Sequence, residues 1–300
     1  MTGMRVRLGH GPRWVAAAAC SALLATACLS ACDADDAASA PTNPSHASTS
    51  PDDTTHVRVL QLNLCNSGRA ACYSGGDAVD LAVGLVHDHR PDVVTLNEVC
   101  RDDVTVFERA MSAAHPSTTV AAAFAPAPNR LTHSPVTCRY GEDFGDGVLV
   151  AVPRSSQAAT TGNRSRSGVY PVQDPADPEE RVWVCIDVAT RFAACTTHAA
   201  STDAAVALSQ CRHLLTSVVP GAARAGTRLP LVLGADLNLP ATGSSGVEAC
   251  LPGGYQRTDD GGVQDVVVSP GAELRSRTVI DMEGTTDHPG LLVDVALPRP

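Results

Sequence analysis

Lysine is absent from this 300-residue chain, so all 22 of its basic residues are arginines. The 32 acidic residues outnumber them, and a net negative surface argues against tight binding of a polyanion through charge alone. Aromatic residues make up only 3% of the sequence, and none marks a hairpin tip that could enter a lipid bilayer. An acidic chain can still meet a phosphate group through a metal ion held by its carboxylates.

No two cysteines have the CxxC spacing, so a structural zinc site is the weaker interpretation. Of the 11 cysteines, eight lie beyond Cys32, and this even number suits disulfides in an oxidising compartment. The sequence leaves the connectivity open. If neighbours pair, the bonds join residues 65 and 72, 100 and 138, 185 and 195, and 211 and 250; the third would join the two ends of a hairpin.

The first 32 residues have the layout of an export signal: arginines, then an Ala- and Leu-rich run, then small residues ending at Cys32. The apolar run is short for a membrane span. The last four residues of this segment, LSAC (29–32), resemble a bacterial lipobox, which implies cleavage before Cys32 and a lipid on the Cys32 sulfur. An ordinary secretory signal cleaved nearby is the alternative. We expect an extracellular protein, or one on the outer face of the cytoplasmic membrane that contacts the membrane only through this anchor.

Residues 33–56 are rich in Ala, Ser, Thr, Pro and Asp, and contain no aliphatic residue larger than alanine. Such a segment buries too little apolar surface to offset the entropy of ordering, so we predict a disordered tether. The remaining body, residues 57–300, is large enough for a full core. It shows no internal repeat and no second linker, which favours one domain, and we expect a monomer.

Hydrophobic patterns in the body predict strands that alternate with helices at first and pair as hairpins later. A helix over 77–91 links two strands, which predicts that they are parallel, and a helix over 203–219 has Ser201 or Thr202 as a plausible cap. Residues 115–140 and 162–180 are expected to be loops. The pattern indicates an α/β protein with a mixed sheet. Strands are predicted over 57–65, 92–99, 145–153, 181–188, 191–199, 228–238, 263–270 and 290–297.

Polar side chains stand at the ends of several apolar strands, where burial is costly unless they are paired. Any one of them could mark a strand leaving the core for water. Repeated along the chain, however, they predict one site, because neighbouring strand ends in an α/β sheet meet at one rim. The set comprises Asn63, Glu98, His198, Asp236 with Asn238, and Asp287 with His288.

This set of residue types suits one chemistry. Glu98 and Asp287 are oxygen ligands of the kind that Mg²⁺ or Ca²⁺ takes. His198 and His288 can move protons near neutral pH, and Asp236 can orient or deprotonate a water. The two asparagines can donate to a phosphate oxygen or position a ligand. Together they predict metal-assisted attack of water on a phosphate ester.

Six motifs in order, QLNLCN, DVVTLNEV, CTTHAA, GADLNLP, VQDVVVS and TDHPG, resemble those of the endonuclease/exonuclease/phosphatase superfamily. GADLN is similar to the family's GDxN, TDH to its SDH, LNEV to its LQE, and VQDVVVS to its IDYVFVS. The resemblance runs from Val57 to about Val295. It implies an α/β four-layer sandwich of two mixed β-sheets flanked by helices.

The resemblance also implies roles. Glu98 would bind the divalent metal, Mg²⁺ or else Ca²⁺ or Mn²⁺, with Asn63 and Asp287 close to it. Asn238 would hold the scissile phosphate, and Asp236 would position or activate the water.

The same resemblance implies that His288 would transfer a proton and that Asp265 of VQDVVVS would steady His288. His198 would assist at the leaving oxygen or at a phosphate oxygen. Which histidine is the acid and which the base stays open.

Arg164 and Arg166 could meet a nucleic-acid backbone, although two arginines in an exposed loop are usually only solvated. The leading hypothesis is a secreted, metal-dependent phosphodiesterase, specifically an extracellular nuclease whose partner is a nucleic acid. A sphingomyelinase-like lipid phosphodiesterase is the second hypothesis, which the scarcity of aromatic residues disfavours. The third is a tethered, non-catalytic binding module on the same fold.

Overall fold

The computed structural model describes residues 54–154, 163–189, 191–222 and 228–298. The predicted export signal, the lipidation site Cys32 and residues 33–53 of the predicted tether lie outside this part. Strand β1 begins at Thr54, so the last three residues of the predicted tether belong to the folded body. Among the described helices, none has the length and apolar character that a membrane crossing requires.

Two six-stranded sheets form the centre of the body, with strand orders β13-β14-β1-β2-β6-β3 and β11-β12-β10-β9-β8-β7. Both are mixed, because β1–β2 and β9–β10 are parallel while their other neighbours are antiparallel. The first sheet comprises β1 (Thr54–Asn63), β2 (Val93–Cys100), β3 (Thr118–Pro126), β6 (Phe144–Pro153), β13 (Glu273–Ile280) and β14 (Gly290–Pro298). The second comprises β7 (Arg164–Val169), β8 (Val182–Val188), β9 (Phe192–Thr197), β10 (Leu231–Asp236), β11 (Gln256–Asp259) and β12 (Gln264–Val268).

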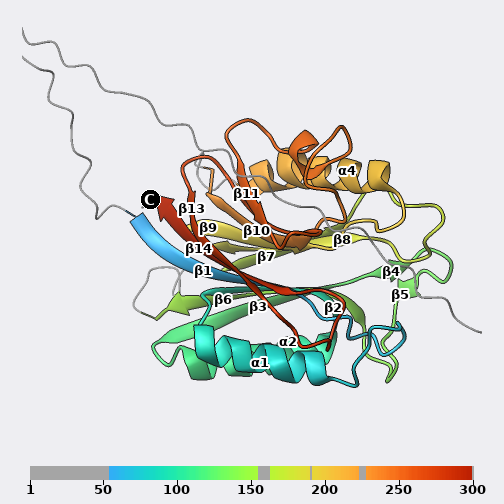
Figure 1. The fold of residues 1–300 in the computed structure, drawn as a ribbon, viewed down its shortest axis with the longest axis horizontal. Helices are drawn as coiled ribbons and strands as arrows, with labels where there is room; N and C mark the ends of the chain where they lie inside the picture. The colour runs from blue at the N-terminus through green and yellow to red at the C-terminus, as the bar shows by residue number, and fades with distance from the viewer. Residues whose placement is uncertain (1–53, 155–162, 190, 223–227, 299–300) are drawn as a thin grey trace, which may run out of the picture. The chain divides into compact units, whose positions relative to one another are not determined.

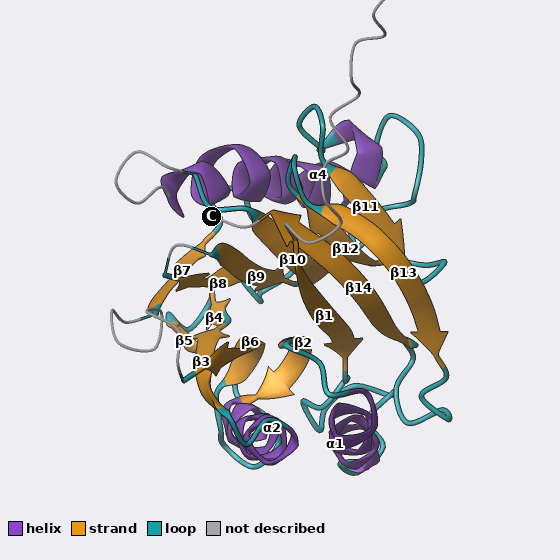
Figure 2. Cartoon of the chain, turned by 90° about the vertical axis from the view of Figure 1, so that its left-hand side faces the viewer, coloured by secondary structure: helices purple, strands orange, loops and turns teal. Residues whose placement is uncertain are grey.

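Helices cover the outer face of each sheet, and Figures 1 and 2 show the resulting four layers. The first sheet is covered by α1 (Asp77–His89) and α2 (Arg101–Ala114). The second is covered by α4 (Ala204–His213), which continues as a π turn (Leu214–Val218) and a 3-10 turn (Val219–Ala222). The four-layer α/β sandwich is therefore confirmed. A small ribbon, β4 (Pro128–Asn129) with β5 (Ser134–Pro135), and a 3-10 turn (Val247–Ala249) complete the described elements.

The core follows from the period-two alternation of the strands. Valines such as Val59, Val93 and Val232 fill the space between the sheets, and their alternate neighbours, such as Leu60 and Leu233, pack under the helices. Because both faces of each sheet are covered, the central strands are buried along most of their length. Each fully buried aliphatic side chain contributes roughly 1.5–3 kcal/mol relative to exposure.

Several local predictions need correction. Residues 115–140, expected to be a loop, contain β3, an alanine-rich strand at the edge of its sheet. Residues 162–180 likewise contain the polar edge strand β7. Neither has the alternating β-branched pattern of a central strand. The cap of α4 is Asp203, not Ser201 or Thr202, and its carboxylate accepts hydrogen bonds from the amides of Ala205 and Val206.

All eight cysteines beyond Cys32 form disulfides, and the predicted neighbour pairing is confirmed. The bond between Cys185 and Cys195 joins directly opposite residues of the β8–β9 hairpin. The other three tie loops to the ends of strands or helices: Cys65–Cys72, Cys100–Cys138 and Cys211–Cys250.

Candidate active site

The faces of the two sheets that pack against each other change from apolar to polar toward one end of the sandwich. On β1, the alternate residues are Val57, Val59, Gln61 and Asn63, all buried. The parallel strand β2 shows the same change, and β10 of the other sheet ends on the buried Asp236. Side chains from both sheets therefore meet at this end, which lies toward the right in Figure 1, where β4 and β5 are drawn.

Gly234 in GADLN lets the two sheets approach each other closely above this site. A Cβ at Gly234 would lie 2.2 Å from Thr95 Oγ1 and 3.0 Å from Gln61 Oε1. The absence of a side chain thus has a packing reason, because any larger residue would push the sheets apart.

A network of buried amides lies behind the site and pairs its polar groups. Gln61 Nε2 donates to Asn97 Oδ1 at 2.7 Å and to Gln264 Oε1 at 3.1 Å. Asn97 Nδ2 donates to Asp146 Oδ1 at 2.9 Å, and Asn97 Oδ1 also accepts from the Asp236 amide at 3.0 Å. Because these groups satisfy one another, they hold both sheets at a fixed distance without an unpaired polar group.

Asn63 connects two carboxylates from different sheets. Its Nδ2 donates to Glu98 Oε1 at 2.9 Å and to Asp236 Oδ2 at 3.0 Å. Its Oδ1 accepts from the Cys65 amide at 3.1 Å, which fixes the orientation of the side-chain amide. Asn63 was predicted to lie close to the metal; in the structure its Nδ2 bridges the two carboxylates while its oxygen faces Cys65.

Glu98 occupies an unusual backbone position. Its φ is 56°, and it lies where the register between β2 and β6 shifts. Left-handed backbone in a non-glycine residue costs free energy of order 1 kcal/mol or more and is found most often at functional sites. Here the irregularity turns the Glu98 side chain toward Asn63 and the rim, where it is only 20% exposed.

Asp236 is fully buried. Its Oδ1 accepts from the Asn238 amide at 3.1 Å, and its Oδ2 lies 3.6 Å from His288 Nε2. Burial raises the pKa of Asp236 to about 6, with hydrogen bonds from Asn63 and Asn238 and the charge of His288 opposing this. A carboxylate with such a pKa can accept a proton from water near neutral pH.

Asn238 lies just beyond the end of β10, with a φ of 51° that turns it away from the strand path. Its Nδ2 donates to the Ala199 carbonyl at 3.0 Å, so one of its two N–H groups is used for positioning. The backbone turn lets the Asn238 amide donate to Asp236, while the Asn238 side chain bonds to Ala199, the residue after His198.

His198 is buried, and its orientation is set by a residue that the sequence analysis missed. Arg181 Nη1 lies 3.0 Å from His198 Nδ1. Because a guanidinium can only donate, Nδ1 accepts and the ring hydrogen lies on Nε2. Burial, Arg181 and His288 hold the pKa of His198 well below its usual value. His198 is therefore a neutral hydrogen-bond donor, which suits a phosphate or leaving oxygen better than it suits a general acid.

Arg181 is in turn held by acids, with Asp177 at 3.1 Å and Glu179 at 2.9 Å. The His198 amide donates to Asp146 Oδ2 at 3.1 Å, so Asp146 also positions the histidine. Burial raises the pKa of Asp146 to about 7. Neither Arg181 nor Asp146 could be recognised from a motif, although Arg181 is the first residue and Asp146 the second residue of a predicted strand.

Asp287 and His288 lie at the open side of the site, beside a cavity of about 240 Å³. The Asp287 side chain is 59% exposed, and its Oδ1 is 3.8 Å from His288 Nε2. A ligand atom of Asp287 also lies within 4.8 Å of the sulfurs of Cys65 and Cys72. Those cysteines form a disulfide and cannot hold a metal, so Asp287 offers the oxygen ligand there.

The structure places Asp265 away from His288, on the face of β12 opposite to that of Gln264. Asp265 is buried, but it pairs with Arg257, whose Nε donates to its Oδ1 at 2.7 Å. The neighbouring Gln264 faces the site instead, accepting from Gln61 and donating to the Pro289 carbonyl. Aligned letter by letter, VQDVVVS also sets Gln264, not Asp265, opposite the aspartate of IDYVFVS. The carboxamide of Gln264 thus fixes the segment before β14 that carries His288.

Arg164 and Arg166 are not part of the site. Both lie on β7, opposite Cys185–Asp187 of β8 and far along the sheet from Arg181. Arg166 makes an ion pair with Asp187 at 3.0 Å and donates to the Val218 carbonyl at 3.2 Å. Its guanidinium stabilises the packing of the turns after α4, which corrects the predicted substrate role.

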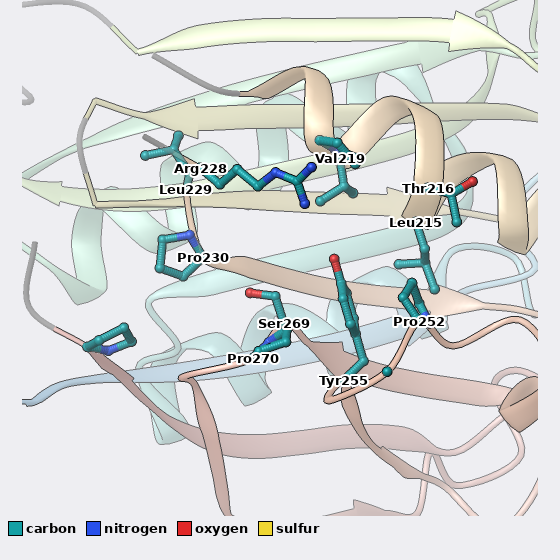
Figure 3. A pocket seen from close by; sticks show the side chains of 13 residues that line it. Leu215, Thr216, Val219, Arg228, Leu229, Pro230, Pro252, Tyr255, Ser269 and Pro270 are labelled. Atoms are coloured by element: carbon teal, nitrogen blue, oxygen red, sulfur yellow. The ribbon is translucent and has the colours of Figure 1, made fainter. Parts of the chain in front are cut away.

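A cavity of about 660 Å³ lies at the other end of the second sheet (Figure 3). Leu229 and Pro230, which line it, precede β10, and Ser269 and Pro270 follow β12. The full length of β10 therefore separates this cavity from Asp236.

The donor set of the site fits a hard divalent cation. Glu98 Oε1 and Asp236 Oδ2 lie within about 6 Å of each other, since each is about 3 Å from Asn63 Nδ2. Two carboxylates at this distance repel each other, and a bound cation would relieve this repulsion. Mg²⁺ needs only one or two carboxylates, because waters and substrate oxygens complete its shell.

No family model and no curated relative matches this sequence. Among solved structures, the chain is similar to an endonuclease/exonuclease/phosphatase from Beutenbergia cavernae DSM 12333, with a TM-score of 0.55 and 18% identity over 81% of this chain and 72% of that one. It is also similar to the human nocturnin catalytic domain with bound sulfate (TM-score 0.56, 15% identity, 81% and 97%). A third similar structure is D. rerio TDP2 complexed with single strand DNA product, with a TM-score of 0.52 and 12% identity over 80% of this chain and 99% of that one. The chain therefore has the fold of the endonuclease/exonuclease/phosphatase proteins.

Proposed function

We propose that this protein is a metal-dependent phosphodiesterase, and that its substrate is nucleic acid outside the cell. One observation carries the proposal: Asn63 joins Glu98 and Asp236 across two sheets, with His288 3.6 Å from Asp236. A non-catalytic module has no reason to bury these acids so close together, because their repulsion and desolvation are unfavourable for folding.

Glu98 is the principal ligand for the cation, with Asp287 available at the open side. When bound, the cation supplies Lewis-acid stabilisation of charge on the phosphate oxygens. The chain supplies the rest. Asn63 and the Asn238 amide fix the Asp236 carboxylate, so that one of its oxygens can orient the attacking water and accept its proton.

His288 and His198 act at different points. His288 Nε2 lies 3.6 Å from Asp236 Oδ2, so a small approach brings it within range to exchange a proton as the water oxygen bonds to phosphorus and the ester P–O bond breaks. His198 presents its Nε2–H as a neutral donor, held by Arg181, and stabilises a phosphate or leaving oxygen. The free N–H of Asn238 is available to a further phosphate oxygen.

The surface favours a nuclease over a lipid phosphodiesterase. In the described part, the exposed large apolar side chains are not gathered at one hairpin tip; they are Leu131, Tyr140, Val169, Val172 and Val279. A loop that enters a bilayer needs several such residues together. The structural neighbour D. rerio TDP2 was determined with a single strand DNA product, which supports nucleic acid as the substrate class proposed here.

An activity panel tests the proposal. The purified chain with Mg²⁺ is expected to hydrolyse bis-p-nitrophenyl phosphate and to degrade DNA or RNA, while sphingomyelin vesicles and inositol phosphates stay intact. EDTA should abolish the activity. Hydrolysis that persists in EDTA would exclude the metal mechanism, and cleavage of sphingomyelin alone would replace nucleic acid as the substrate. Absence of activity on every substrate would favour the binding module.

We also propose that the protein is exported and anchored by a lipid on Cys32, as the lipobox-like LSAC suggests. The mature protein should begin at Cys32, and its mass should exceed that of the unmodified chain by the acyl groups. A mature mass that matches an unmodified Cys32 would exclude the anchor while leaving secretion possible.

A further inference from the structure

Two disulfide-bonded loops form the rim beside Asn63 and Glu98. The first follows β1 and is closed by Cys65–Cys72, two residues after Asn63. The second precedes β6 and is tied by Cys100–Cys138 to the end of β2, two residues after Glu98. Each loop is thus fixed to a strand that carries a site residue.

The two loops are also bonded to each other. The Arg139 amide donates to the Ser67 carbonyl at 2.8 Å, and Arg69 Nε donates to the Thr137 carbonyl at 2.8 Å. They pack so closely that a Cβ on Gly68 would lie 2.6 Å from Arg139 Cβ. Ser67 is four residues beyond Asn63, so it lies within roughly 14 Å of it.

At this rim, Tyr140 has the most exposed ring of the described residues. Its exposed fraction is 76%, and the Arg139 guanidinium lies 5.8 Å from its ring centroid. Arg139 makes no ion pair within the described part of this acidic chain. Gly141 follows with a φ of 105°, in a turn that its amide closes onto the Cys138 carbonyl. A ring held outward by a disulfide-bonded turn contributes little to the core and stays open to contact with a ligand.

We propose that Tyr140 and Arg139 form a subsite for single-stranded nucleic acid, in which a base stacks on the tyrosine ring and the guanidinium meets the adjoining phosphate. This rests on the proposed function and extends it from nucleic acid in general to single strands. Base stacking on an aromatic ring tolerates any sequence but requires a base whose face is free, which a duplex does not offer.

The surroundings favour a nucleotide over a membrane. Glu142 lies two residues from Tyr140, and Asp143 pairs with Arg101 at 2.7 Å. Entry into a bilayer needs several exposed apolar residues together, and Tyr140 is flanked by Arg139 and Gly141. A single nucleotide, by contrast, needs only one ring and one cation.

The test compares Tyr140→Ala with Tyr140→Phe, and with Leu131→Ala as a matched control that removes another exposed apolar side chain (69% exposed). Each variant's kcat/KM for a dT12 oligonucleotide is divided by its kcat/KM for bis-p-nitrophenyl phosphate, a diester that carries no nucleobase. We expect this ratio to fall by about 5- to 30-fold in Tyr140→Ala. It should be kept in Tyr140→Phe and in Leu131→Ala. A 12-base-pair duplex should not respond to the Tyr140→Ala change.

A ratio that is the same in Tyr140→Ala and wild type would overturn the subsite, as would an equal fall in Leu131→Ala. If wild type fails to cleave bis-p-nitrophenyl phosphate, the proposed function fails separately. The subsite is then judged by fluorescence anisotropy of labelled dT12, which Tyr140→Ala should bind about 5- to 30-fold more weakly. If Tyr140→Ala loses binding to phosphatidylglycerol vesicles but keeps its affinity for dT12, the ring is assigned to a membrane and the nucleotide subsite is overturned.

Discussion

Replacement of Asp236 by asparagine is expected to lower the turnover number by about 10²- to 10⁴-fold, the range that a positioned acid or base supplies. The carboxylate accepts hydrogen bonds from Asn63 and from the Asn238 amide, which leaves it oriented beside His288. Asparagine preserves the shape but cannot take a proton from water. The measurement is kcat for bis-p-nitrophenyl phosphate at saturating Mg²⁺, with circular dichroism to establish the fold.

Asp265→Asn is the matched control for this change. Asp265 is equally buried, and it lies directly opposite Ala235, the residue before Asp236. Its carboxylate faces Arg257 and not the site, so the substitution should reduce stability by weakening that ion pair but leave most of the activity in the folded protein. Equal losses of activity in folded Asp236→Asn and Asp265→Asn would contradict the assignment.

The convergence of the site residues could be predicted because each interrupts an apolar strand at its end. Glu98 and Asp236 are costly to bury alone, and the ends of neighbouring strands share one rim. Their positions at the ends of predicted strands were therefore enough to place them together. The disulfides followed similarly from the sequence, because Cys185 and Cys195 flank a short hairpin.

Asp265 was misplaced because strand register is a tertiary property. A shift of one residue moves every side chain of a strand to the opposite face, and VQDVVVS offers two adjacent polar residues to choose from. The pairing of Ala235 with Asp265 and of Asp236 with Gln264 decides it. The role of Arg181 at His198, 17 residues away, likewise depends on the β8–β9 pairing, which brings the two together.

Replacement of Glu98 by glutamine is expected to weaken divalent-metal binding by about 100-fold or more, since even changes behind a metal ligand cost 10- to 100-fold. Glu98 presents the more accessible of the two carboxylates that Asn63 joins, and its left-handed backbone directs it to the rim. Glutamine removes the charge while retaining the volume. Activity should then require a correspondingly higher Mg²⁺ concentration.

Glu108→Gln is the control, because Glu108 is an exposed residue of α2 and its replacement changes the net charge by the same amount. The most direct test of a shared cation site is calorimetric titration of Mn²⁺ into the wild type and both variants. One tightly bound ion per chain is expected in the wild type and in Glu108→Gln, and its loss is expected in Glu98→Gln. Unchanged Mn²⁺ affinity in Glu98→Gln would contradict the shared cation site.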